Sequence, residues 1–360
     1  MSGVRQLDYG KLWAIEMHLT TALPIATMFF KHWHTDDTEV GVVVAKARFW
    51  RRNDGVFEVD PTPPELILAE VFMGDPASSA LMYDQDIAPG KAATDLIIHA
   101  YARSPRGALL TDWPVAVRIS GGKQYGFHVR GPSHWEKRSA VWRLSAPQPV
   151  QTVPITYALA YGGAAPGQTG DPPQVFQFNP VGMGFATRAS LDIGEPIAAP
   201  QIGELAEFMQ DDPLATMMVH GFGAVTKTWL PRRSEAGTFD AGWHMARAPR
   251  MPPDYNLRYW NAAHRQLQFT DPLKGVEVIE VTGVSHHTPI VTIALPDAAL
   301  GLFADGDEAT QQRMMLDTVE IDLRSDTAAE HCLTLTWRCR IDAPHRFVSS
   351  EILHIQPEEQ

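Results

Sequence analysis

The stretch VGVVVAKARFW at residues 40–50, followed by RRNDG at 51–55 and VFEV at 56–59, decides the fold class. Its first part is an apolar run rich in β-branched residues, which is typical of a buried strand. Asp54 and Gly55 form the pair that a tight hairpin turn favours, because such a turn needs positive φ angles. We therefore predict a β-hairpin at this point of the chain.

Similar short runs occur on both sides of the middle of the chain. We predict further strands at 66–72, 95–102, 114–119, 124–130, 139–144, 276–281, 290–295, 318–323 and 332–341. Short helices are predicted at 204–210, 239–247 and 308–316. This pattern indicates a mainly β protein with antiparallel, sandwich-like sheets and few helices.

Residues 1–342 are predicted to form a single domain, since no internal repeat or flexible Gly/Ser linker divides them. Its parts are an N-terminal β block at 9–150, an irregular Gly/Pro-rich segment at 151–268 and a C-terminal β block at 269–342. A short acidic tail follows at 343–360.

The net charge of -12 argues against nucleic acid as a partner, because phosphate contacts need local cations. No apolar run approaches the length of a membrane span, and Asp8 and Glu16 interrupt the region where a signal peptide needs apolar residues. We expect a cytoplasmic protein without membrane insertion.

Cys332 and Cys339 lie about 23 Å apart if they share a strand, which predicts two unpaired thiols.

Catalytic motifs are incomplete in this sequence. Gly131-Pro132-Ser133-His134-Trp135 lacks the second glycine of a nucleophile elbow. His32 and His34, with Asp36 and Asp37, could form half of a metal site, but Asp beside a turn more often caps its own backbone. His286 and His287 precede a turn without an identifiable orienting partner. We therefore predict neither an enzyme nor a bound cofactor or metal.

Residues 226–268 form a basic island in an acidic chain, with seven basic and three acidic residues. Two interpretations remain open. The arginines either clamp irregular loops by donating to carbonyl groups, or they face a partner together with aromatic residues. The residues predicted to bind a partner on the second interpretation are Arg232, Arg233, Arg247, Trp243, Tyr259 and Trp260.

Several motifs together resemble one family. They are VVVAKARF (42–49), GDPASSALMY (74–83), DIAP (86–89), ATDLII (93–98), YALAYGG (157–163), NPVGMGF (179–185), GFG (221–223), AGTFDAGW (236–243), RAP (247–249), PPDY (252–255) and RYWNAA (258–263). In this order the motifs resemble the domain of unknown function family numbered twenty-one sixty-nine, over Tyr9 to Arg340. After the paired alanines, where family members tend to continue with proline, this chain has His264.

The resemblance implies a non-enzymatic adaptor or chaperone of a type VI secretion system, because members are encoded beside secretion spike genes. Such a protein stabilises a cognate effector toxin, or its spike-tip domain, and helps to load it on the spike. We expect the motif residues Gly162, Gly163, Asn179, Gly182, Gly184, Gly237, Asp240 and Asn261 to be structural. For Trp243, Tyr259 and Trp260 packing in the core is favoured over partner contact, because large aromatic residues beside irregular loops usually supply the packing of those loops.

Two other functions remain open at this stage. One is a metal-dependent or sugar-processing hydrolase on a β scaffold, suggested by the histidine groups and the many Trp and Tyr residues. The other is a structural component of the spike. On the adaptor hypothesis, replacing Arg232 and Arg233 by Glu weakens effector binding without unfolding the adaptor. The sequence names neither the effector nor the stoichiometry.

Overall fold

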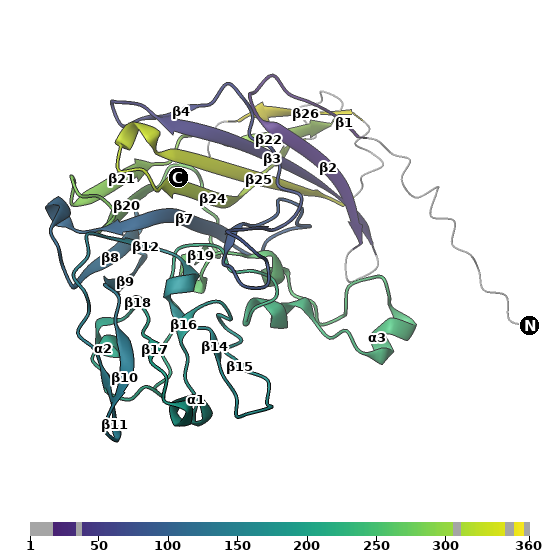
Figure 1. The fold of residues 1–360 in the computed structure, drawn as a ribbon. Coiled ribbons are helices and arrows are strands. Elements are labelled where there is room, and N and C mark those ends of the chain that lie inside the picture. The colour runs from purple at the N-terminus through teal and green to yellow at the C-terminus, as the bar shows by residue number, and fades with distance from the viewer. Residues whose placement is uncertain (1–16, 34–37, 305–310, 343–348, 356–360) are drawn as a thin grey trace, which may run out of the picture.

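The computed structural model describes residues 17–33, 38–304, 311–342 and 349–355. Strands dominate, and the few helices are short (Figure 1). The helices are α1 (Arg188–Ile193), α2 (Leu205–Phe208), α3 (Ala241–Ala246), η2 (Pro105–Gly107), η3 (Tyr157–Leu159), η4 (Arg232–Ala236), η5 (Leu257–Trp260), η6 (Arg265–Leu267) and η8 (Ala328–Glu330). The predicted mainly β class is confirmed. No helix of the described residues is both long and apolar enough to cross a membrane.

The largest sheet has eight strands and joins the two ends of the chain. Its main order is β12 (Thr152–Pro154), β7 (Thr94–Arg103), β24 (Met315–Leu323), β25 (Cys332–Ile341), β3 (Glu39–Arg51) and β2 (Ala26–Trp33). β19 (Gln268–Phe269) also pairs with β7, and β4 (Phe57–Val59) with β3. The pairing of β3 with β4 confirms the predicted hairpin. Because β25 pairs with β3 and β24 with β7, the two strand blocks share one sheet, as predicted.

The other sheets are smaller. The five-stranded sheet runs β18 (Ile202–Gly203), β9 (Gln124–Arg130), β8 (Asp112–Ile119), β20 (Val278–Thr282) and β21 (Ile290–Ala294). The four-stranded sheet runs β1 (His18–Thr20), β26 (Ser349–His354), β22 (Leu300–Ala304) and β23 (Gln312–Arg313). The three-stranded sheet runs β11 (Val141–Leu144), β10 (His134–Arg138) and β17 (Ile197–Ala198). Short pairs complete the set: β5 (Val71–Phe72) with β6 (Leu81–Tyr83), β13 (Tyr161–Gly162) with β16 (Met183–Gly184), and β14 (Ala164–Ala165) with β15 (Gln174–Val175).

Strand periodicity explains how β3 is buried on both faces. Ala45 and Ala47 point into the hydrophobic core, which the large and five-stranded sheets share. The alternate residues point to the opposite face. There Lys46 is held by Asp86 at 2.9 Å and is 5% exposed. The segment that contains Asp86 therefore covers the polar face of the large sheet, while the other face builds the core.

Some local predictions were wrong. The helix predicted at 308–316 is replaced, within the described residues, by β23 and the start of β24. Residues 308–310 lie outside the described part. Of the strand predicted at 66–72 only β5 forms. Within the described part of the chain the strand pairings are antiparallel, as predicted, except for three parallel ones: β24 with β7, β1 with β26 and β13 with β16.

Candidate protein-binding site

A fully buried carboxylate joins two segments that are distant in the sequence. Asp95 is 0% exposed and accepts hydrogen bonds from Lys91 Nζ at 2.9 Å, the Ala262 amide at 2.8 Å and Asn261 Nδ2 at 3.0 Å. Asn261 Nδ2 also donates to the Ala93 carbonyl at 2.7 Å. Buried polar groups that are satisfied in this way fix the backbone around them. The start of β7 and the segment after η5 are therefore locked together.

A second buried amide holds the glycine-rich segments. Asn179 Nδ2 donates to the carbonyl groups of Tyr157 at 2.8 Å and Tyr161 at 3.0 Å. Gly162 has φ 149°, and a Cβ atom there would lie closer than 3.0 Å to the Asn179 carbonyl. A side chain at this position would therefore push β13 away from Asn179. A Cβ would also lie closer than 3.0 Å to a neighbouring atom at Gly163, Gly182, Gly184 and Gly237.

A pocket of about 720 Å³ opens between these two locked regions. Its apolar lining includes Tyr157, Phe176, Phe178, Met217, Met218, Val225, Leu230 and Pro231, and its polar lining includes Gln124, Tyr125, Glu204, His220, Arg258, Asn261, His264 and Gln266. Phe178 is 46% exposed and Met218 61% exposed. Two of the motifs through which the chain resembles the family, YALAYGG and RYWNAA, thus contribute residues to one pocket. The pocket volume lies in the range of ligand-binding sites.

Part of the pocket lining is a cluster of ring side chains. The Tyr125 hydroxyl lies 3.2 Å from His220 Nδ1 and accepts a hydrogen bond from the Gly221 amide at 3.3 Å. The His264 ring stacks on Tyr125 with centroids 4.6 Å apart. His220 is 3% exposed, and its Nε2 finds no hydrogen-bond partner among the described residues. The nearest carboxylate oxygen, Glu207 Oε2, lies 3.6 Å away.

Burial sets the protonation of this cluster. It raises the pKa of Tyr125 despite the hydrogen bond from Gly221, and it lowers the pKa of His264 to about 4. A hydroxyl, an imidazole and a carboxylate in this order could in principle activate a nucleophile. A phenol with a raised pKa stays protonated at neutral pH, so the Tyr125 hydroxyl is a hydrogen-bonding group there.

Arg232 lines the pocket but is almost completely buried. It is 4% exposed and pairs with Asp84 at 2.8 Å. Its guanidinium also donates to the carbonyl groups of Tyr259 at 2.7 Å and Val225 at 2.5 Å. For Arg232 this arrangement matches the first of the two interpretations of the basic island, in which arginines clamp irregular loops by donating to carbonyl groups. Arg233 is exposed and donates to Gln177 Oε1 at 3.2 Å.

Tyr259 and Trp260 are half-buried and pack against each other, with ring centroids 5.3 Å apart. Lys227 Nζ lies 4.4 Å from the centre of the Trp260 ring. Burial lowers the pKa of Lys227 to about 8, although Asp84 acts in the opposite direction. The Trp260 ring thus contacts a partly desolvated cation.

Helix α3 stands apart from the strands of the body (Figure 1). Asp240 caps its first turn by accepting from the Trp243 amide at 2.7 Å. The Trp243 indole donates to the Arg250 carbonyl at 2.7 Å and packs on Phe239, with centroids 4.7 Å apart. Arg247 donates to the Met251 carbonyl at 3.1 Å. The predicted partner-binding residues are therefore divided between this arm and the body.

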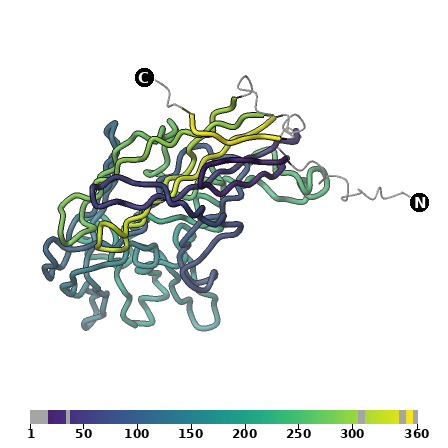
Figure 2. Tube along the Cα trace, turned by 90° about the horizontal axis from the view of Figure 1, so that it is seen from above, coloured from purple at the N-terminus to yellow at the C-terminus, as the bar shows by residue number. Residues whose placement is uncertain are grey.

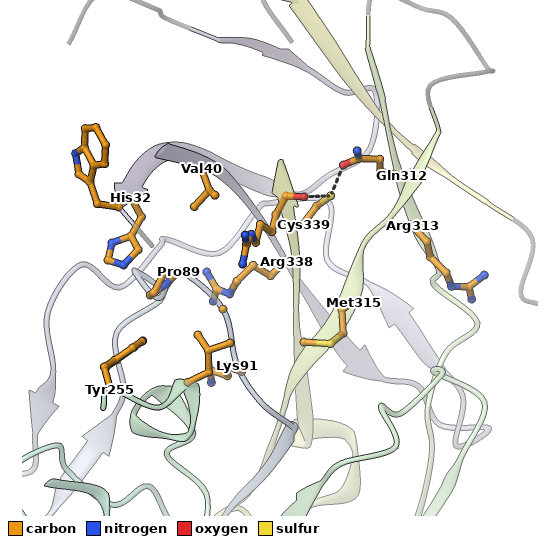
Figure 3. A pocket seen from close by; sticks show the side chains of 14 residues that line it. His32, Val40, Pro89, Lys91, Tyr255, Gln312, Arg313, Met315, Arg338 and Cys339 are labelled. Atoms are coloured by element: carbon orange, nitrogen blue, oxygen red, sulfur yellow. Dashed lines mark hydrogen bonds between the residues drawn. The ribbon is translucent and has the colours of Figure 1, made fainter. Parts of the chain in front are cut away.

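A second pocket of about 490 Å³ lies beside β2 and β25. His32, Lys91 and Arg338 line it together with Tyr255 and Cys339 (Figure 3). Lys91 and Arg338 are already paired with buried carboxylates of this chain.

The remaining histidine and serine candidates lie apart from the large pocket. His34, Asp36 and Asp37 fall outside the described residues. His287 Nε2 is 3.1 Å from Asp326 at an exposed position, and His286 Nδ1 contacts the Ser104 carbonyl at 2.7 Å. No group of three or more His, Cys, Asp or Glu side chains in the described part is placed to hold a metal ion.

Comparison with protein families identifies the chain. The model of a family described as an uncharacterized protein conserved in bacteria (DUF2169) matches residues 36–338. The chain belongs to this family. Neither the curated proteins nor the solved structures gave a match. The DUF2169 region contains both locked regions and the whole lining of the large pocket.

The sequence did not single out the ring cluster of this DUF2169 protein. Tyr125 lies in an ordinary alternating strand, while His220 and His264 come from two loops far along the chain. The sequence feature that could have pointed to the two histidines is their position beside family motifs. His220 directly precedes the GFG motif, and His264 directly follows RYWNAA. Only the fold shows that these two motif ends meet at β9.

Proposed function

We propose that this DUF2169 protein is a non-enzymatic adaptor that binds and stabilises a cognate type VI secretion effector, or its spike-tip domain, and promotes loading on the spike. The observation that carries the proposal is the large pocket with exposed Phe178 and Met218 at its lining. Exposed apolar side chains that gather at a concave site mark interaction surfaces. The family resemblance supplies the class of partner.

Binding alone is sufficient for the proposed stabilisation. A partner that binds the folded effector and not the unfolded chain stabilises it by RT ln(1 + [L]/Kd), about 2.7 kcal/mol at a hundredfold excess over Kd. A change of about 1–2 kcal/mol already alters the cellular abundance of a marginally stable protein. No covalent chemistry is needed for this role.

We propose that the protein acts in the cytoplasm before secretion. The two free cysteines support this location, because both thiols lie on β25 without a disulfide partner. Burial raises the pKa of Cys332 to about 11 and that of Cys339 to about 12, so both stay protonated and unreactive.

Co-purification tests the proposal. The tagged full chain is expressed together with the products of its neighbouring genes, and the retained proteins are identified by mass spectrometry. We expect one effector or spike-tip protein to be retained in a defined ratio. Retention of none of these products would contradict the adaptor role, whereas turnover of a sugar or ester substrate by the purified chain would favour an enzyme.

A further inference from the structure

We propose that the large pocket binds an extended peptide segment of the partner, with one large apolar side chain inserted beside Phe178 and Met218 and a main-chain carbonyl bound by Arg258. This inference rests on the proposed function and names the recognition site. It assigns the contact to the pocket and not to the α3 arm or to the basic island as a whole.

The apolar lining is suited to a side chain and not to water. Phe176 and Phe178 form a tilted pair with ring centroids 5.7 Å apart, and Phe176 continues to Tyr161 at 5.0 Å. Met217 and Met218 also line the pocket. Methionine side chains are flexible and polarisable, so they adjust to apolar groups of different shape. Burying these exposed groups against a partner residue removes apolar surface from water and so stabilises the complex.

Three arginines line the pocket, and two of them are paired with carboxylates of this chain. Arg232 is paired with Asp84, and Arg265 pairs with Glu235 at 2.8 Å. The Arg258 side chain also lines the pocket, but it makes no hydrogen bond or ion pair within the described part of the chain. A half-buried guanidinium has five N–H donors that need acceptors. A peptide carbonyl supplies such an acceptor without adding a buried charge.

The hydrogen-bonding groups elsewhere in the lining fit the same occupant. Gln124 and Gln266 carry side-chain amides that both donate and accept hydrogen bonds. An extended peptide presents its N–H and C=O groups in alternation, with side chains that alternate between two faces. One face can then fill the apolar lining while main-chain groups contact the polar lining. A small apolar molecule would leave Arg258 without an acceptor.

Selection of linear peptides tests this assignment on the intact protein. Random peptides displayed on phage are selected against the immobilised full chain, and enriched sequences are synthesised with a fluorophore for anisotropy titration. We expect enrichment of peptides with a large apolar residue. Binding should weaken by at least about tenfold in Phe178→Glu, Met218→Glu and Arg258→Gln.

Matched controls keep the result interpretable. Met209→Glu changes a methionine that is 79% exposed outside the pocket lining, and Arg233→Gln changes an exposed arginine outside it. Both should bind as the unmodified chain does. Failure to enrich any peptide overturns the inference, as do equal affinities of pocket and control variants. Co-purification of a secretion partner with the Phe178→Glu, Met218→Glu double variant would refute the pocket assignment and leave the adaptor role intact.

Discussion

Asp95 and Asn261 are 166 residues apart in the chain, yet their side chains share a buried hydrogen bond of 3.0 Å. This bond holds the segment that leads to His264 and the pocket wall against the start of β7. The pocket geometry therefore depends on a polar contact in the interior. An isolated buried carboxylate would be costly, but Asp95 is compensated by four donors from this chain.

Asn261→Ala should lower the free energy of unfolding by about 2–4 kcal/mol. The substitution leaves Asp95 Oδ1 and the Ala93 carbonyl short of a donor, and unsatisfied buried acceptors carry a full desolvation cost. Urea unfolding followed by tryptophan fluorescence measures the change. Asn256→Ala is the control, since that exposed side chain only caps η5 and should cost about 1 kcal/mol. Equal losses would contradict the central position of Asn261.

Arg232→Glu should unfold or strongly destabilise the protein, by about 3–5 kcal/mol, whereas Arg233→Glu should change stability by less than about 1 kcal/mol. Arg232 is the buried partner of Asp84, and a second carboxylate there would repel it. Arg233 is exposed. The melting temperatures of the two single variants, compared with that of the unmodified chain, test whether Arg232 is structural and Arg233 is not. This expectation replaces the one drawn from sequence, in which both substitutions leave the fold intact.

Gly162→Ala should destabilise the protein far more than Gly170→Ala. Both glycines have positive φ, 149° and 95°, so both variants carry conformational strain of about 1–2 kcal/mol. Only at Gly162 does the added Cβ collide with backbone, whereas nothing lies within 4 Å at Gly170. Denaturation midpoints should differ by the equivalent of at least about 2 kcal/mol. Similar midpoints would mean that Asn179 and β13 can move apart at little cost.

His264 should stay neutral well below the pH at which a free histidine titrates. Burial lowers its folded-state pKa to about 4, while the unfolded chain titrates near 6.5. The unfolded state then binds more protons, so this group makes stability fall as pH drops from about 6.5 to about 4. Histidine Cε1 resonances followed by NMR measure the pKa directly, with the resonance assigned from its loss in His264→Gln. A midpoint near 6.5 would contradict the buried stack on Tyr125.

The fold was predictable where a local pattern and a long-range requirement agree. The apolar run in β3 and the Asp54-Gly55 turn specify a hairpin whatever lies beyond it. The helix predicted near 308–316 failed because Met315 and Leu316 extend β24, where pairing with β25 overrides local preference. The pocket was not predictable, since Tyr125, His220 and His264 come from three separate parts of the chain. Likewise, sequence cannot separate buried Arg232 from exposed Arg233, because only the position of Asp84 distinguishes them.

The most direct test of the account is the level of the effector in cells. The gene for this protein is deleted, and effector abundance is measured by immunoblot after complementation with the unmodified chain, with Met209→Glu, or with the Phe178→Glu, Met218→Glu double variant. We predict that the effector is depleted in the deletion strain, is restored by the unmodified chain and Met209→Glu, and stays depleted with the double variant. Normal effector levels and normal secretion in the deletion strain would contradict the adaptor function.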